Sequence, residues 1–347
     1  MRALTIDAHG GLEQLRYRED VEPPVLPSSG AVRVRLLAAA LNRLDLWTVG
    51  GMPGVTITPS WVLGADGMGV VAEASADVTS VRVGDRVMLN PGLSCRECEY
   101  CLKGEQPLCV RFRLLGEHAP GTLAEQIVVP ATNVRRVPDG VSDETAAAFT
   151  LATLTAWRMC VSRAQVRAGE DVLIWGIGGG VALAALQICK ARGARVFVTS
   201  SSAEKLERAR ALGADELLDH SKVDVAKEIR ARTRRRGVDV VVDSIGEKTW
   251  DRSLGSLARA GRLVTCGGTS GPALTMDVRR LFWHQWSILG STMGSDAELD
   301  AIVAELAAGR LLTPIDSVHD LADGRAAFER MESGTQFGKI VVRIAHD

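Results

Sequence analysis

Short runs of alternating apolar and polar residues, separated by glycines and prolines, fill the first 140 residues. Three of them have the composition of half-buried strands: 31–36, 69–73 and 85–89. Alternation with a period of two, bounded by turn residues, is typical of antiparallel strands with one face toward a core. The pattern therefore predicts a β-rich, barrel-like domain at the start of the chain.

The pattern changes after Gly169, where continuous apolar runs alternate with helical ones. The predicted strands are Asp171–Trp175, Ala194–Thr199, Val238–Asp243, Arg262–Cys266 and Ser287–Met293, and the predicted helices between the first of them are Val181–Arg192 and Ala203–Leu212. Strands that are joined through helices form right-handed crossovers and a parallel sheet. The predicted fold class is α/β, with a doubly wound parallel sheet beside the β-rich domain.

A chain of 347 residues is too long for one ordinary core. We place the β-rich domain at residues 1–153 and the doubly wound domain at 154–296. A helix that Asp143 caps, running to Cys160, leads from one to the other. A helix at Ala297–Ala308 and a strand at Lys339–Ile344 follow, so residues 297–347 are predicted to return to the first domain.

A glycine-rich turn follows the first strand of the doubly wound domain directly and opens a helix. It reads Gly176-Ile177-Gly178-Gly179-Gly180-Val181-Ala182. Glycine lets the backbone turn tightly and approach a pyrophosphate, which then lies at the helix N-terminus. Because this context is present, the turn predicts a dinucleotide site, and the alternative is an ordinary strand-to-helix turn. The predicted contacts are Gly176, Gly178, Gly179, Gly180 and Val181.

The second strand ends without the carboxylate that normally binds the ribose 2′-hydroxyl of NAD. Ser200 and Ser201 stand there, and Lys205 follows in the next helix. Hydroxyls and a cation suit a 2′-phosphate. We therefore predict NADP(H) in preference to NAD(H), with Glu204 as the residue that would favour NAD(H).

Four of the seven cysteines lie within fifteen residues, at Cys95, Cys98, Cys101 and Cys109. Four thiolates can close a tetrahedron around Zn²⁺ and leave no open position, so the predicted zinc is structural. An iron–sulfur cluster is the competing interpretation of this spacing. The crowding and the odd cysteine count favour metal binding in a reducing compartment over disulfides.

The formal net charge of −1 and the 24% of charged residues give no reason to expect nucleic acid or a membrane surface as a partner. The arginines between 230 and 236 are interpreted as a solvated helix end. The sequence has no run of 18 apolar residues and no signal-peptide pattern, so we expect a cytoplasmic protein.

Taken together, these motifs resemble the medium-chain dehydrogenase/reductase superfamily over the whole chain. The resemblance rests on 63–71, the four cysteines, the turn at 176–182, the segment 240–246 and the terminal Gly338-Lys339-Ile340-Val341. It implies a GroES-like catalytic domain at 1–153 with a zinc lobe at 95–109, a Rossmann domain at 154–296, and a return segment that completes the first. It also implies an oxidoreductase that uses NAD(P).

The departures from the family pattern bear on the chemistry. Zinc alcohol dehydrogenases of the superfamily have Cys, His and Glu where this chain has Asn42, Ala65 and Asp66, and their third protein ligand falls near Leu151. Asparagine, alanine and leucine are poor zinc ligands. The chain is therefore predicted to lack a catalytic zinc.

The segment Asn42-x-x-Asp45 is similar to that of the zinc-free quinone and enone reductases of the superfamily, which keep an aromatic residue where Trp47 stands. The resemblance implies Asn42, Asp45 and Trp47 as catalytic residues. The alternative is that Asn42 and Asp45 only brace a loop. Arg43 matches a position whose side chain contacts the cofactor phosphates in several relatives. Gly267 and Lys339 are the remaining residues predicted to bind the cofactor.

Three functional hypotheses remain. The first is an NADPH-dependent reductase of enones or quinones, in which Asn42 or backbone N–H groups hold the substrate oxygen and water or Asp45 supplies the proton. The second is an alcohol dehydrogenase whose metal uses unusual ligands, such as Asp45, Asp66 and the pair Glu117-His118. The third binds cofactor without turnover. An apolar edge strand at 287–293 predicts a homodimer or homotetramer.

Overall fold

The computed structural model describes residues 1–344, which form two compact units. The first unit comprises Met1–Ala152 and the segment from Ser295 onward, and the second comprises Thr153–Gly294. Because the segment after Ser295 belongs to the first unit, both ends of the described chain lie in the same unit. Within residues 1–344, the structure contains no candidate membrane-spanning helix.

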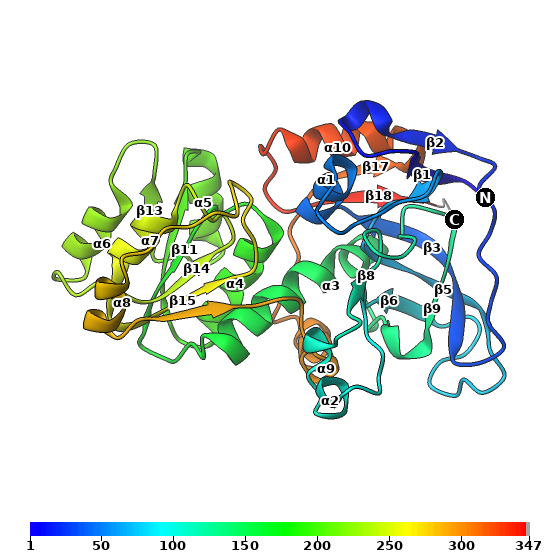
Figure 1. Ribbon diagram of the computed structural model, residues 1–347, viewed down its shortest axis with the longest axis horizontal. Coiled ribbons are helices and arrows are strands. Elements are labelled where there is room, and N and C mark those ends of the chain that lie inside the picture. Colours follow the sequence, from blue (N-terminus) through cyan, green and yellow to red (C-terminus); the bar gives the residue numbers. More distant parts are fainter. Residues whose placement is uncertain (345–347) are drawn as a thin grey trace. The chain divides into compact units, whose positions relative to one another are not determined.

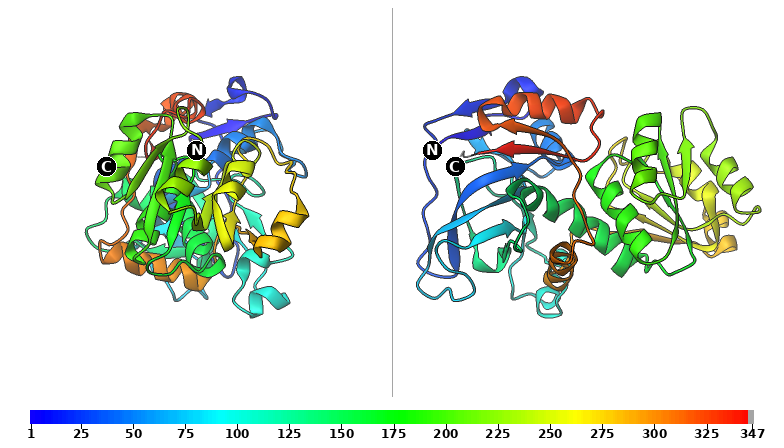
Figure 2. Two further views of the ribbon diagram at one scale, coloured as in Figure 1. Left: turned by 90° about the vertical axis from the view of Figure 1, so that its left-hand side faces the viewer. Right: turned by 180° about the vertical axis from the view of Figure 1, so that it is seen from behind.

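A seven-stranded sheet forms the centre of the first unit. Its order is β10-β6-β5-β3-β18-β17, and β9 also pairs with β3. These strands are β3 (Ala31–Ala40), β5 (Asp66–Ala74), β6 (Arg86–Leu89), β9 (Gln126–Pro130), β10 (Val134–Arg136), β17 (Ile315–Asp320) and β18 (Lys339–Arg343). Strand β18 runs antiparallel to β3, so the end of the chain is hydrogen-bonded into a sheet built by its beginning. Figures 1 and 2 show the red C-terminal strands beside the blue β3.

Smaller elements surround this sheet. They are the three-stranded sheet of β1 (Ala3–Ile6), β2 (Arg16–Arg18) and β4 (Trp61–Val62), the pair β7 (Gly92–Leu93) and β8 (Arg113–Leu114), and the helices α1 (Arg43–Gly50), α2 (Glu99–Leu102), α3 (Asp143–Trp157), α9 (Asp296–Ala307) and α10 (Gly324–Glu332). Alternate residues of the strands fill one core, which includes Val34, Leu36 and Ile340. The alternation in the sequence thus predicted the buried faces correctly.

The second unit is a six-stranded parallel sheet of order β13-β12-β11-β14-β15-β16. The strands are β11 (Asp171–Ile174), β12 (Arg195–Ser200), β13 (Glu216–Asp219), β14 (Val238–Asp243), β15 (Leu257–Thr265) and β16 (Ser287–Gly290), and the helices are α4 (Gly180–Ala191), α5 (Ala203–Ala211), α6 (Val225–Arg232), α7 (Trp250–Ser256) and α8 (Val278–His284). Helices α4 and α5 pack against β11, β12 and β13, whereas α7 packs against β14 and β15 and contacts α6 (Figure 1). The strand order reverses between β11 and β14, as in a doubly wound fold.

The structure differs from the predicted elements at two ends of α3. Asp143 is not the cap: the Ser142 hydroxyl accepts the Thr145 N–H at 3.2 Å, and Asp143 pairs with Arg86 instead. The α-helix ends at Trp157, and residues 158–163 form a π-helical turn. The sequence pattern could not predict the cap or the π-helical turn, because both depend on contacts that form only in the folded protein.

Candidate active site and metal centre

A lysine, an aspartate and an asparagine form a buried polar cluster in the first unit. The Lys339 ammonium donates to Asn42 Oδ1 at 2.5 Å and to Asp66 Oδ2 at 2.9 Å. The Asp66 side chain is completely buried and that of Lys339 is 4% exposed. A buried charge is costly unless it is paired and hydrogen-bonded, and here each charge neutralises the other.

Asp66 has a partner on both of its oxygens. Oδ2 also accepts the Asn42 side-chain N–H at 3.0 Å, and Oδ1 accepts the backbone N–H of Leu151 at 2.8 Å. The cluster therefore joins β5, β18, the start of α1 and the middle of α3. These elements are up to 297 residues apart in the sequence.

The chemistry of the partners determines the orientation of the Asn42 amide. Lysine only donates and an ionised carboxylate only accepts, so Oδ1 must face Lys339 and Nδ2 must face Asp66. The second Nδ2 hydrogen faces the Ala40 carbonyl at 3.4 Å. Both polar atoms of the Asn42 side chain are thus occupied within the protein.

Asp45 lies beside this cluster and is 2% exposed. Its Oδ2 accepts the backbone N–H of Asn42 at 2.6 Å, so the carboxyl also braces the first turn of α1. Burial raises the pKa of the Asp45 carboxyl to about 7, although hydrogen bonds from backbone N–H groups and the charge of Lys339 act in the opposite direction. A carboxyl with this pKa exchanges its proton near neutral pH.

The other predicted residues of α1 lie nearby in the sequence but outside the cluster. Arg43 and Trp47 are both half-buried, and desolvation lowers the pKa of the Arg43 guanidinium. Another tryptophan, Trp286, stands between α8 and β16. It packs in the core of the second unit, where its indole N–H donates to the Ala258 carbonyl at 2.9 Å.

The cluster does not fit a catalytic zinc. Ala65 has no ligand atom, the side chain of Leu151 has none, and both oxygens of Asp66 are already hydrogen-bonded. Zinc binding would place a divalent cation next to the Lys339 ammonium, which is electrostatically unfavourable. Over residues 1–344, the one group of three or more His, Cys, Asp or Glu side chains placed to hold a metal is the four-cysteine group.

In the second unit, the glycine-rich turn connects β11 to α4. Gly176 and Gly178 have φ values of 69° and 123°, in the region that favours glycine. Thr199, at the end of β12, fixes the turn: its hydroxyl accepts the Gly176 N–H at 3.1 Å and its carbonyl accepts the Ile177 N–H at 2.8 Å. Helix α4 starts at Gly180, which leaves its first N–H groups for an anion.

The remaining predicted cofactor residues of this unit follow the carboxyl ends of neighbouring strands. Ser200 ends β12, and Gly267 comes two residues after β15. Parallel strands end at the same edge of their sheet, so these residues lie along the edge that carries the glycine-rich turn. Ser200 Oγ accepts the Ser202 N–H at 3.1 Å, which leaves its own hydrogen to donate.

Two features of the sites were missed in the sequence. Asp243, at the end of β14, is buried and accepts the N–H groups of Ile245 and Gly246 at 2.8 and 3.1 Å, so it shapes the turn beside the strand-order reversal. The contact between Lys339, which the sequence predicts as a cofactor ligand, and Asp66 in the buried cluster is the second. A lysine that opens the apolar strand Lys339–Arg343 was the signal that could have indicated a buried ion pair.

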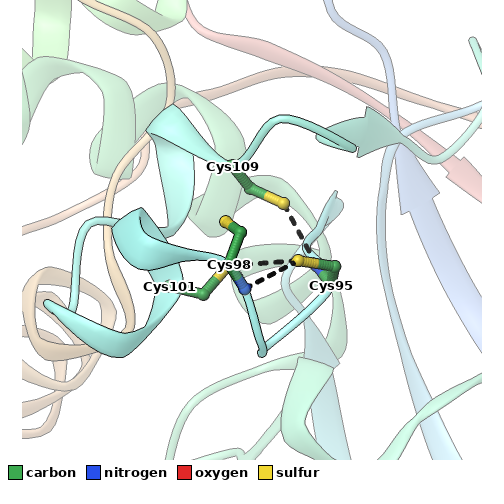
Figure 3. A group of neighbouring side chains, drawn as sticks. All are labelled: Cys95, Cys98, Cys101 and Cys109. Carbon is green, nitrogen blue, oxygen red and sulfur yellow. Dashed lines mark hydrogen bonds between the residues drawn. The ribbon is translucent and has the colours of Figure 1, made fainter.

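The four cysteines gather into one group on the lobe that contains α2. Their sulfur atoms all lie within 4.8 Å of one another (Figure 3). Backbone N–H groups point at the sulfurs: Cys95 N–H donates to Cys109 Sγ at 3.2 Å, and Cys98 N–H to Cys95 Sγ at 3.3 Å. Hydrogen bonds of this kind, led by that of Glu97, lower the pKa of the Cys95 thiol to about 5. The group fits a tetrahedral zinc with four thiolate ligands.

Comparison with known proteins places the chain in a family. Residues 28–139 match the alcohol dehydrogenase GroES-like domain, and residues 180–308 match the zinc-binding dehydrogenase family. The chain is 31% identical over 332 residues to an alcohol dehydrogenase of Geobacillus stearothermophilus, covering 95% of this chain and 96% of that protein. It is 33% identical over 304 residues to a quinone oxidoreductase of Pseudomonas aeruginosa, covering 86% and 85%.

Among solved structures, one of an NAD-dependent alcohol dehydrogenase matches with a TM-score of 0.94 and 42% identity, over 99% of this chain and 100% of that one. The chain therefore belongs to the medium-chain dehydrogenase/reductase superfamily and is an oxidoreductase of that superfamily. The predicted family and fold class are confirmed.

The cysteine group yields a prediction about metal content. Purified protein should contain one zinc per chain, and the double variant Cys95→Ser/Cys98→Ser should contain none and melt at a lower temperature, because structural zinc binding contributes directly to the free energy of folding. Metal analysis and thermal unfolding measure both effects. The control Cys266→Ser, outside the group, should keep its zinc. Wild-type protein without zinc would contradict the assignment.

Proposed function

We propose that this protein is an NADPH-preferring reductase of enones or quinones that transfers hydride without a catalytic zinc. The observation that carries the proposal is the cluster of Asn42, Asp66 and Lys339. Asn42 and Asp66 stand where zinc alcohol dehydrogenases have Cys and Glu, and here both side chains are hydrogen-bonded to the Lys339 ammonium. The similarity to a quinone oxidoreductase supports the same class of reaction.

The electrostatic demand of the reaction also favours this class. Oxidising a simple alcohol builds charge on one alkoxide oxygen, which a Lewis-acid metal stabilises by several kcal/mol. Hydrogen-bond donors supply about 2.7–4 kcal/mol each. That is sufficient for an enolate or a hydroquinone anion, in which the charge is delocalised. The bound nicotinamide would supply the hydride, and the protein would hold the substrate oxygen.

The alternative of an alcohol dehydrogenase with unusual metal ligands has less support. Both oxygens of Asp66 are occupied, and within residues 1–344 Glu117 and His118 do not belong to any group placed to hold a metal. The similarity to alcohol dehydrogenases keeps this alternative as the second candidate. Turnover of any enone or quinone would exclude the third hypothesis, a protein that only binds cofactor.

The proton that completes the reduction would come from Asp45 or from water. Asp45 is the buried carboxyl nearest to the cluster in the sequence, and its pKa of about 7 leaves it about half protonated at neutral pH and largely protonated below it. A general acid works best when its pKa is close to the working pH.

The preference for NADPH would arise at the end of β12. Ser200 has a hydroxyl hydrogen available, Ser201 is exposed, and Lys205 lies in the first turn of α5. Glu204, the residue that would favour NAD(H), has a side chain that is 80% exposed and lies 3.8 Å from Arg208. Since no carboxylate ends the strand, this site suits a 2′-phosphate better than a ribose hydroxyl.

Assembly is part of the proposal as well. Strand β16 is the edge of the six-stranded sheet, and helix α8 before it exposes Val278, Phe282 and Trp283 by 61%, 63% and 67%. An open edge next to exposed apolar side chains favours pairing of two copies about a two-fold axis. Light scattering at micromolar concentration should give at least a dimer, and a monomer would contradict this part.

The proposed reaction is tested with a panel of enones, quinones and simple ketones, with NADPH oxidation as the measurement. Enones or quinones should be turned over and simple ketones should be poor substrates. With Asp45 as the acid, kcat should fall about tenfold for each pH unit above about 7. The variant Asp45→Asn should lose this pH dependence. Simple alcohols as the best substrates would contradict the proposal.

The cofactor preference is tested by two substitutions. A charge-assisted hydrogen bond contributes about 1.5–3 kcal/mol, so wild type should prefer NADPH by roughly tenfold to a hundredfold in kcat/KM. Lys205→Ala should raise KM for NADPH with kcat little changed, and Ser200→Asp should reverse the preference. Lys222→Ala, at an exposed lysine after β13, serves as the control and should change neither. Equal or better use of NADH by wild type would contradict the assignment.

A further inference from the structure

We infer that the Lys339 ammonium is the group that hydrogen-bonds the substrate oxygen and stabilises the negative charge that develops there. This inference rests on the proposed function and identifies the residue that supplies the charge. In this inference Lys339, rather than Asn42, binds the substrate oxygen. The role also differs from the one that the sequence predicts for Lys339, which is binding of the cofactor.

The Lys339 ammonium has one more donor hydrogen than it has acceptors in the described part of the protein. A lysine ammonium has three donor hydrogens. Within residues 1–344 the structure gives it two acceptors, Asn42 Oδ1 and Asp66 Oδ2. A buried charged group normally satisfies all of its hydrogens, and one left over indicates a partner outside the protein chain. A substrate carbonyl oxygen is an acceptor of the required kind.

The orientation of the Asn42 side chain leaves it no hydrogen for a substrate. Its Oδ1 accepts from Lys339, and its Nδ2 hydrogens face Asp66 Oδ2 at 3.0 Å and the Ala40 carbonyl at 3.4 Å. To donate to a substrate, the Asn42 amide would have to break its hydrogen bond to the buried Asp66 carboxylate. Asn42 is thus a positioning residue, which holds the ammonium from one side while Asp66 holds it from another.

Burial makes the donor effective. The Lys339 side chain is 4% exposed, so water competes only weakly for its third hydrogen, and Asp66 holds the ammonium in place while it balances the formal charge. Donors that are fixed before the reaction begins need no reorganisation when charge develops, which is the basis of oxyanion stabilisation. As hydride reaches the conjugated carbon, the π electrons move to the oxygen beside the ammonium. The ammonium keeps its proton throughout. Asp45 or water gives a proton to the α-carbon of the enolate, or to the oxygen of a hydroquinone anion.

This assignment limits the substrate class. The ammonium has one hydrogen left for the substrate oxygen, because the other two are bonded to Asn42 and Asp66. The preferred substrates are therefore carbonyl compounds whose reduced anion is itself weakly basic, such as quinones and aryl-substituted enones. Rates across such a series should rise as the reduced anion becomes less basic.

The test separates charge from packing with three variants. Lys339→Met alone leaves Asp66 buried without its cation, which is strongly destabilising and can unfold the protein. Lys339→Met/Asp66→Asn removes both charges and should regain much of the thermal stability. It should still lose at least a hundredfold in kcat with an enone. Lys339→Arg keeps a cation and should recover part of that loss.

Two results would overturn the inference. If the double variant keeps kcat within about threefold of wild type, Lys339 only balances the charge of Asp66. If Lys339→Arg and the double variant raise KM for NADPH while kcat is unchanged, the ammonium binds the cofactor instead.

A binding measurement distinguishes failure of this inference from failure of the proposed function. 4-Nitrophenol, whose anion absorbs in the visible range, is titrated with pH in the complex of the enzyme with NADP⁺. The ammonium should lower the pKa of the bound phenol, and the double variant should raise it by at least about one unit, a tenfold effect. A phenol that does not bind, or binds without this difference, would overturn the inference. If the shift is present but no enone or quinone is reduced, the inference stands and the proposed function is wrong.

Discussion

The buried ion pair between Asp66 and Lys339 is the interaction on which the candidate site depends. Removing two charges from water is expensive, and their attraction compensates for it only when the remaining hydrogen-bonding atoms have partners. Asn42 and the backbone of Leu151 provide those partners. The pair also couples the return of the chain to the site, because Lys339 opens the strand β18 that pairs with β3.

The same pair explains why the site is a poor place for zinc. A zinc site requires ligand atoms that are free to converge on the metal, whereas here both oxygens of Asp66 already accept hydrogen bonds from Lys339, Asn42 and Leu151. Ala65 and the side chain of Leu151 contribute no ligand atoms. The chain therefore combines the fold of the zinc-binding dehydrogenases with a buried ion pair of Asp66 and Lys339. The mixture of alcohol dehydrogenases and a quinone oxidoreductase among its relatives fits this combination.

Local patterns predicted much of the structure. The parallel sheet followed from apolar runs separated by helices, and β14 has the predicted bounds, Val238–Asp243. Four cysteines at short spacing were close enough in the chain to predict their gathering. The cluster of Asn42, Asp66 and Lys339 was not predictable in this way, since its members are brought together by the pairing of strands from opposite ends of the chain. Local sequence also could not show that Trp286 lies in a core or that Ser142 caps α3.

If the Lys339 ammonium takes the place of a metal at the reaction site, all zinc in this protein should be bound by thiolates. X-ray absorption at the zinc edge of zinc-loaded, active enzyme tests this directly. The expected result is a single shell of four sulfur atoms at about 2.3 Å, without nitrogen or oxygen ligands. A mixed shell with nitrogen or oxygen at about 2.0–2.2 Å would mean that zinc also binds elsewhere, and it would contradict the proposed zinc-free site.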